Sequence, residues 1–209
     1  FVQHDLRWIN RAERGYTELV IITKNRQYLL EKATCALAAA QINVLAADVY
    51  TRNDGIVCDI FRVCTENQLP ITSSSTKKKV DQIFSTLIQQ DEYNSKLYLK
   101  KKRNFLQKDT NEGALPFPVR AFVNNHASQQ FSAIEIQALD RIGLLHDIFL
   151  HIGKCGVSTM HARICTEKGA AIDSIYVCNI DGSKVTDPDK ILELEQAMQK
   201  IVGFEHADK

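Results

Sequence analysis

The sequence predicts an α+β fold built from two similar units, and three observations lead to this prediction. First, residues 26–63 and residues 141–177 match each other segment by segment. Second, stretches with the two-residue alternation of strands give way to stretches with the spacing of helices, in the same order in both copies. Third, 209 residues with 44% hydrophobic content are enough to fill two cores of about a hundred residues each. The chain is therefore expected to be a duplicated unit.

The repeat consists of short matching segments. In order, Arg26–Leu30 (RQYLL) matches Arg141–Leu145 (RIGLL), Ala47–Thr51 (ADVYT) matches Ala162–Thr166 (ARICT), and Asp59–Val63 (DIFRV) matches Asp173–Val177 (DSIYV). The one-residue gap in this alignment falls beside Gly55 and Gly169, where a hairpin turn tolerates a change in length. The two copies are therefore expected to contain the same elements in the same order.

The first unit is predicted from alternation, spacing and turn residues. Its expected elements are a strand at 17–23, a helix at 29–40, strands at 42–49 and 56–63, a helix at 80–88, and a candidate fourth strand at 97–99. The second helix is indicated by Val80, Phe84 and Ile88, which share one helical face. Asn53–Gly55 (NDG) is typical of a hairpin turn between the two middle strands. The resulting order is βαββαβ.

The second unit repeats these elements. They are a strand at 132–139, a helix with Leu145, Ile148, Phe149 and Ile152 inward, strands at 157–166 and 170–179, and a helix at 188–201. Asp187 and Pro188 indicate a helix start. The aspartate side chain can cap free backbone N–H groups, and the proline fits the first helical position, where no backbone N–H donor is needed. Only eight residues follow Ile201, which leaves little room for a fourth strand. A strand at 119–123 is the alternative that closes this sheet.

Each unit is predicted to be a split βαβ, or ferredoxin-like, arrangement with an antiparallel sheet and both helices on one face. The expected organisation is a lead-in at 1–16, a first unit at 17–100, a linker at 101–131 containing the strand 119–123, and a second unit at 132–209. One sheet face of each unit lacks a cover, so the units are expected to pack against each other. Asp48 and Arg163 would then approach each other, and two solvent-exposed charges are the other interpretation.

Composition excludes several classes of function. Lys and Arg number 26 against 25 Asp and Glu, so the net charge of +1 gives no case for a nucleic-acid or membrane partner. No apolar stretch approaches the roughly 18–20 residues that span a bilayer, and no signal-like segment opens the chain, so a cytoplasmic location is expected. RNA binding on an open sheet is possible for the fold type, but Ile172 and Ser174 stand where stacking aromatic rings are needed.

The six cysteines include no C-x-x-C pair and lie in apolar runs, so buried reduced thiols are expected. The chain begins at Phe1 without a methionine, and we therefore expect a processed protein or a fragment.

The strongest candidate for a ligand site is the turn between the first strand and first helix of the second unit. Its residues are Asp140, Arg141, Ile142, Gly143, Leu144 and Leu145. Gly143 would leave the helix N–H groups open to a small anion such as an amino-acid carboxylate. Asp140 would either cap the helix or receive a ligand ammonium group, and a plain capped helix start is the competing interpretation.

The equivalent turn of the first unit is the weaker candidate. Asn25 and Arg26 replace Asp140 and Arg141, and Tyr28 replaces Gly143, so a side chain is expected to block close approach to the backbone. His161 projects from the opposite sheet face and is a second, weaker candidate for ligand contact.

The motif D-R-x-G-L-L between strand and helix, within a duplicated unit, resembles the ACT domain, a regulatory module of amino-acid metabolism. An ordered set of segments resembles more closely the carboxy-terminal tandem ACT region of the bacterial protein-PII uridylyltransferase/uridylyl-removing enzyme family. These segments are Arg26-x-Tyr-Leu, Tyr50–Gly55 with Asp59–Phe61, Phe117–Val119, Asp140–Leu145 and His161–Ile164. The resemblance implies allosteric regulation by glutamine, with the parent enzyme adding UMP to the PII nitrogen-signalling protein or removing it.

No catalytic residue or cofactor is predicted for this chain. A strand of paired carboxylates for a metal-bound nucleotide is missing from the sequence, and His146–Asp147 lies in a predicted helix without a companion His and Asp cluster. By the resemblance, the nucleotidyltransferase and hydrolase domains lie upstream, and Mg²⁺ is expected only there. The alternative function is a non-catalytic interaction module of ACT repeats with a vestigial ligand site.

Overall fold

The computed structural model describes residues 3–52, 54–90, 94–99, 118–167 and 169–203. In chain order the elements are β1 (His4–Arg11), a 3₁₀ turn η1 (Ala12–Arg14), β2 (Tyr16–Lys24), α1 (Leu29–Ala39), β3 (Ile42–Asp48), β4 (Ile56–Thr65), α2 (Ser74–Ile88), a 3₁₀ turn η2 (Ser95–Leu97), β5 (Arg120–Asn124), β6 (Ser132–Leu139), α3 (Leu144–Lys154), β7 (Val157–Glu167), β8 (Ala170–Asn179) and α4 (Pro188–Val202). This is the predicted α+β class, with two ferredoxin-like units.

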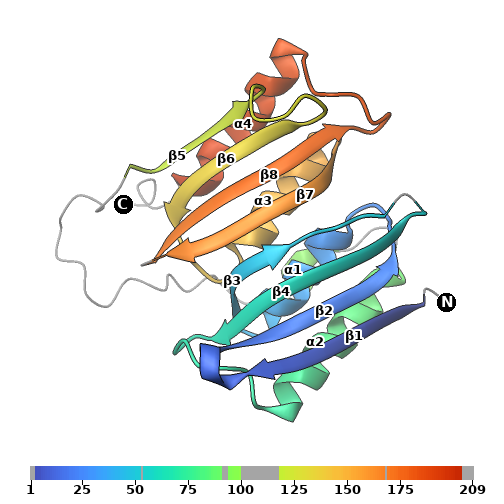
Figure 1. Ribbon diagram of the computed structural model, residues 1–209, viewed down its shortest axis with the longest axis vertical. Coiled ribbons are helices and arrows are strands. Elements are labelled where there is room, and N and C mark those ends of the chain that lie inside the picture. Colours follow the sequence, from blue (N-terminus) through green and yellow to red (C-terminus); the bar gives the residue numbers. More distant parts are fainter. Residues whose placement is uncertain (1–2, 53, 91–93, 100–117, 168, 204–209) are drawn as a thin grey trace.

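The described strands form one continuous antiparallel sheet in the order β1-β2-β4-β3-β7-β8-β6-β5. The helices lie together on one face of this sheet, and the other face is open (Figure 1). The two repeats meet at the centre, where Ala46–Asp48 of β3 pairs with Arg163–Cys165 of β7. The expected docking of the repeats is therefore confirmed, and it takes the form of a shared sheet.

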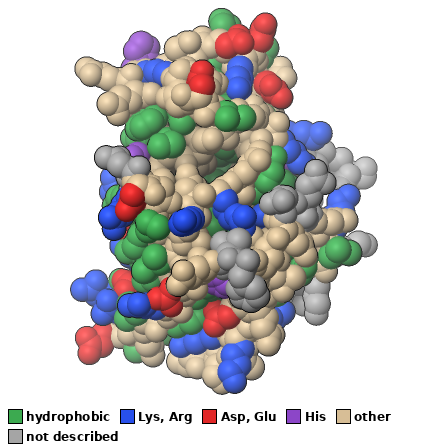
Figure 2. Space-filling model, turned by 90° about the vertical axis from the view of Figure 1, so that its right-hand side faces the viewer, with side chains coloured by type: hydrophobic (Ala, Val, Ile, Leu, Met, Phe, Trp, Pro, Cys, Tyr) green, Lys and Arg blue, Asp and Glu red, His purple; other side chains and the backbone are tan. Residues whose placement is uncertain are grey.

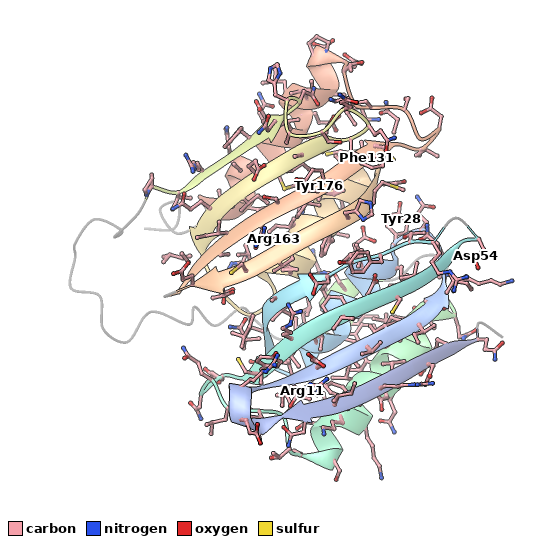
Figure 3. The ribbon with its side chains drawn as sticks, in the orientation of Figure 1. Arg11, Tyr28, Asp54, Phe131, Arg163 and Tyr176 are labelled. Atoms are coloured by element: carbon pink, nitrogen blue, oxygen red, sulfur yellow. The ribbon has the colours of Figure 1, made fainter. Side chains whose placement is uncertain are left out.

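Asp48 and Arg163 are direct neighbours in this central pairing, as the sequence suggested. Their side chains make no ion pair with each other in the described structure, because the Asp48 carboxylate accepts from Arg62 of β4 at 2.7 Å. Arg163 is exposed on the open face of the sheet (Figure 3).

The strand that closes each sheet precedes its unit, which corrects the predicted βαββαβ order to ββαββα. In the first unit the closing strand is β1, within the segment expected to be a lead-in. Residues 97–99, expected as a strand, are instead the last residue of η2 and the two residues after it. β1 has few apolar residues, but Leu6 and Trp8 pack against the core and Trp8 Nε1 donates to Asp81 of α2 at 2.9 Å. In the second unit β5 pairs with β6 and confirms the alternative strand at 119–123, shifted by one residue.

Helix α1 is buried on nearly all sides because it packs against the sheet, α2 and α3 together. Its alanines Ala33, Ala36, Ala38 and Ala39 are all buried, and their small side chains let neighbouring helices approach closely. Two charged residues, Glu31 and Lys32, are buried in the same helix at 3% and 1% exposure. A charge in such a position needs a partner or a function.

Candidate functional site

The turns that precede α1 and α3 have the same backbone geometry. Tyr28 (φ 62°) and Gly143 (φ 85°) both adopt the left-handed conformation directly before the helix. Asn25 and Asp140 both donate their backbone N–H, to Gly55 O at 2.7 Å and to Gly169 O at 2.9 Å. The two turns are thus similar enough in backbone geometry for their side chains and surroundings to be compared position by position. A left-handed tyrosine is unusual, because the conformation crowds a Cβ atom.

The Asp140 carboxylate, expected either to cap the helix or to receive a ligand ammonium, does not cap α3 and is already bonded within the protein. It accepts from Asn43 Nδ2 at 3.0 Å and from Thr166 Oγ1 at 3.1 Å. Asn43 belongs to the first repeat, so this carboxylate ties the repeats together. Burial raises the pKa of Asp140, while hydrogen bonds from Asn43 and Thr166 and the charge of Arg141 oppose the rise.

The remaining residues of the second turn also make internal contacts. Arg141 Nη2 lies 2.7 Å from Asp147 Oδ2, and Leu144 and Leu145 belong to the core. Ile142 is half-buried. A Cβ atom on Gly143 would lie 3.7 Å from the Cβ of Ala38, so this glycine faces the end of α1.

The space left at this turn, which we call the Gly143 cavity, is about 20 Å³. It lies between the turn and residues of α1 and β3, including Ala38 and Asn43. Such a volume holds roughly one water molecule. The predicted residues therefore come together, but they surround no space for an amino acid.

The equivalent turn of the first repeat borders a much larger space of about 330 Å³, which we call the Tyr28 pocket. Its walls are residues 25–28, 30 and 31 of the first repeat, and residues 149, 152, 153, 156–159 and 180 of the second. Figure 2 shows a hollow on this side of the molecule, and Figure 3 shows Tyr28 where the first repeat meets the second. The larger cavity thus lies at the turn that sequence reasoning ranked as weaker.

Gly153, in the last turn of α3, makes room for the Tyr28 pocket. A Cβ atom at this position would lie 2.9 Å and 3.0 Å from ring carbons of Tyr28 and 2.3 Å from Glu31 Oε1. Real Cβ atoms do not approach other atoms so closely. The absence of a side chain at Gly153 therefore allows both Tyr28 and Glu31 to occupy their positions.

Glu31 is the most unusual residue of the pocket. It is 3% exposed, and its Oε1 atom has no hydrogen-bond partner among the described residues. Burial raises the pKa of Glu31 to about 8, against the opposing charges of Lys32 and Lys154. The Glu31 side chain is therefore mostly a neutral carboxylic acid at pH 7.

Arg26, which lines the pocket, and Lys32, which follows Glu31 in α1, both contact the end of α2. Arg26 Nη1 donates to the carbonyl of Ile88, and Lys32 Nζ donates to the carbonyl of Gln90. Cations at a helix carboxyl terminus satisfy carbonyls that lack partners within the helix. A movement of the Asn25–Tyr28 turn is thereby coupled to α2.

His161 stands apart from both turns. It is exposed on the open face of β7, where its ring packs edge-on against Tyr50 at 6.3 Å and Phe131 at 5.8 Å between ring centroids. It lines neither the Gly143 cavity nor the Tyr28 pocket. Its contact with Tyr50 joins the two repeats on the face away from the helices.

Sequence reasoning missed Glu31, Gly153, Ser158 and Thr159, all of which line the Tyr28 pocket. Three of these residues come from the other repeat, and nothing in a single segment indicates that contact. One signal was present, because Glu31 and Lys32 are adjacent charges in an otherwise apolar, alanine-rich helix.

The described residues contain no group of three or more His, Cys, Asp or Glu side chains placed to hold a metal. No helix in that part of the chain is long and apolar enough to cross a membrane. The six cysteines are free, as expected, but only Cys35, Cys64 and Cys178 are buried. Cys165 is exposed, because it points to the open face of β7.

Comparison with known proteins assigns a class to this fold. Residues 120–203 match a family described as the ACR9-like, ACT-like domain. The match covers most of the second repeat, including its closing strand β5 and helix α4. The second repeat is therefore similar to an ACT-like domain, and the first repeat has the same order of elements.

The particular relatives are bacterial. Over 192 residues the chain is 28% identical to the bifunctional uridylyltransferase/uridylyl-removing enzyme of Rhodospirillum rubrum, a match that covers 91% of this chain and 20% of that protein. The enzymes of the same name from Bradyrhizobium diazoefficiens and Gluconobacter oxydans are 25% and 27% identical, over 93% and 89% of the chain and 20% and 19% of their own lengths. The expected resemblance to a tandem ACT region of these enzymes is confirmed, and the chain spans about a fifth of their length.

One match among solved structures is the crystal structure of aspartate kinase from Synechocystis. The match has a TM-score of 0.47 and 12% identity, and it covers 90% of this chain and 27% of the kinase chain.

Proposed function

We propose that this chain is the amino-acid-sensing regulatory region of a protein similar to the bifunctional uridylyltransferase/uridylyl-removing enzymes, and that its ligand is glutamine. The observation that carries the proposal is the Tyr28 pocket, a cavity of about 330 Å³ between the repeats of an ACT-like fold. The volume lies at the lower end of the roughly 300–1,000 Å³ range of small-molecule sites.

The walls of the Tyr28 pocket suit a small ligand with both polar and apolar parts. Asn25, Ser158 and Thr159 supply polar atoms, while Phe149 and Ile152 supply apolar surface. The amino terminus of α1 also lies at the pocket, and a helix amino terminus favours an anionic group such as a carboxylate. An amino acid combines these properties in few atoms.

The position of the pocket suggests how occupancy is transmitted. A ligand that contacts both repeats binds best to one relative arrangement of them, and so favours that arrangement. Arg26 connects the same turn to the end of α2. In the proposed parent protein, this change would control uridylylation and deuridylylation of the PII signalling protein in the cytoplasm. Mg²⁺ would serve the catalytic domains and not this region.

Titration calorimetry with glutamine tests the proposal. We expect one glutamine per chain, with binding weakened about tenfold or more by Gly153→Ala, because the added Cβ displaces Glu31 or Tyr28. Gly143→Ala is the matched control, since its Cβ meets only Ala38 at 3.7 Å. A wild-type chain that binds neither glutamine nor another amino acid would contradict the proposal.

The alternative is an interaction module with a vestigial ligand site. It is favoured by the closed Gly143 cavity of about 20 Å³ and by the exposed Tyr50, Phe122 and Ile172 on the open sheet face. If the Tyr28 pocket binds no amino acid, while alanine substitutions on this face abolish control of a parent enzyme, the alternative is the correct function.

A further inference from the structure

We propose that Glu31 is the specificity-determining residue of the Tyr28 pocket: it accepts the ligand's ammonium group and releases its own proton as that group binds. The inference rests on the proposed function and adds to it a chemical requirement and a linkage to pH.

The first argument is the placement of Glu31. It lines the pocket, is 3% exposed, and has an Oε1 atom to which no residue in the described part of the chain donates a hydrogen bond. A buried polar atom left without a partner destabilises a folded protein, because it has lost its hydrogen bonds to water. The neighbouring Gly153 leaves room for this group where any larger residue would collide with it. The arrangement is one that a bound donor would complete.

The second argument is the set of charges around Glu31. Lys32 of α1 donates to Gln90 O, and Arg26 of the preceding turn donates to Ile88 O. The charges of Lys32 and then of Lys154 of α3 oppose the rise in the pKa of Glu31, and Tyr28 of the turn packs beside the carboxyl group. No ion pair joins Glu31 to any residue of the described chain. The cationic partner is therefore left for a ligand to supply.

The third argument is the comparison with the second repeat. The residue equivalent to Glu31 is His146, which is buried at the Gly143 cavity, and its Nδ1 lies 3.1 Å from the backbone carbonyl of Glu31. At the closed contact this position holds the repeats together. Of these two equivalent positions, only the one at the Tyr28 pocket holds an acidic side chain with an oxygen that accepts no hydrogen bond from the described residues.

The proton balance of the binding step follows from these groups. In the empty pocket Glu31 is mostly a neutral acid at pH 7, consistent with its pKa of about 8. An incoming ammonium keeps its three protons and pairs with a carboxylate, so the O–H bond of Glu31 breaks and the proton passes to the solvent. Binding lowers the pKa of Glu31, and affinity should rise with pH until Glu31 is ionised without ligand, near pH 8.

Calorimetry with glutamine at pH 7 in phosphate and in Tris measures this proton, because the two buffers differ in ionisation enthalpy. We expect release of most of one proton per glutamine from wild type, because a group with a pKa near 8 is mostly protonated at pH 7. Glu31→Gln should abolish the release and weaken binding at least about tenfold. Glu193→Gln, which alters an exposed glutamate, should leave both unchanged. N-acetylglutamine, which has no ammonium group, should not bind.

The outcomes separate the two proposals. Glutamine binding with equal heats in both buffers, or equal affinity for N-acetylglutamine, would overturn the role of Glu31 and leave the sensing function in place. Binding of no amino acid by a folded wild-type chain would overturn the sensing function itself, and the role of Glu31 with it.

Discussion

Tyr28 and Gly143 occupy the same place in the two repeats, with the same left-handed backbone, yet one borders a pocket and the other a closed contact. Tyr28 packs over Gly153, whereas Gly143 packs against Ala38, and Ala38 and Gly153 are themselves equivalent positions in α1 and α3. At the open contact the glycine is in the helix, at Gly153, whereas at the closed contact it is in the turn, at Gly143. A glycine in a strand-to-helix turn therefore gives a ligand no space when the facing helix takes up that space.

The hydrogen bonds differ in the same direction. Asp140 is bonded to Asn43 and Thr166 across the closed contact, whereas Asn25, its equivalent, is exposed at the edge of the Tyr28 pocket. The closed contact therefore joins the repeats, and in our proposal the open contact is the one that responds to a ligand.

The largest expected effect comes from breaking the closed contact. Asp140→Ala leaves the buried Asn43 amide without its acceptor and leaves Thr166 Oγ1 with only the Val44 carbonyl at 3.4 Å. It should lower the free energy of unfolding by about 2–4 kcal/mol. Asn25→Ala at the open contact should change it by less than about 0.5 kcal/mol, since the residue is exposed. Urea unfolding of the two variants measures both values, and equal losses would contradict the comparison.

The second prediction concerns pH. Glu31 is protonated in the folded chain at pH values where it is ionised in the unfolded chain, so the folded state binds more protons and stability falls as pH rises from about 4.5 to 8. Glu31→Gln should remove a slope of up to about 1.4 kcal/mol per pH unit. Thermal unfolding at several pH values tests this, and parallel profiles for the variant and wild type would argue against it.

Asp59 and Asp173 also contribute to the fall of stability with rising pH, but they do not distinguish the open contact from the closed one. They are equivalent residues, burial raises the pKa of each to about 7, and each accepts one backbone N–H. The remaining slope of the Glu31→Gln variant should fall further with Asp173→Asn, which is the internal check on the assignment.

The third prediction is smaller. Gly143→Ala places a Cβ in the left-handed region at a cost of about 1–2 kcal/mol, while its 3.7 Å distance to Ala38 is an ordinary contact. Tyr28→Ala already has a Cβ in that conformation and should show no such backbone cost. Chemical denaturation of Gly143→Ala should therefore report strain and no collision. A loss well above 2 kcal/mol would mean that the two helices are closer than described.

The smallest effect is expected at the centre of the sheet. Arg163 is exposed and its strand neighbour Asp48 is already paired with Arg62, so Arg163→Ala should change stability by less than about 0.5 kcal/mol. Arg62→Ala should cost more, since it removes the existing partner of Asp48. A reversed ranking in unfolding experiments would show that Asp48 pairs with Arg163 in solution.

The fold could be predicted largely because its signals are local. Alternation, helical spacing and the turn residues Asn53–Gly55 lie within short segments, and the repeat let each copy support the other. The closing strand β1 was missed because it lies at the sheet edge, where charged residues such as Arg7 and Arg11 alternate with its few apolar ones. Edge strands commonly carry such charges, since they discourage pairing with other chains.

The site could be predicted only in part, because its walls come from two repeats. The turn residues were found, but the partner that closes the second turn, Asn43, is 97 positions from Asp140 in the chain. Likewise, the effect of Tyr28 depends on Gly153, which no pattern around Tyr28 indicates. To predict which of the two equivalent turns borders a pocket, one must know which residue of the other repeat faces each turn.

The central pairing of β3 with β7 disfavours pairing between two identical repeats. Asp48 and Arg163 are equivalent residues and lie opposite each other, so this position is its own counterpart under the exchange of the two repeats. Two identical copies of one repeat, joined through the same edge, would place Asp against Asp or Arg against Arg, and like charges directly opposite destabilise a sheet. Two copies of the same repeat should therefore pair poorly through this edge. The sequence difference between the repeats, Asp48 in one and Arg163 in the other, favours pairing of the first repeat with the second.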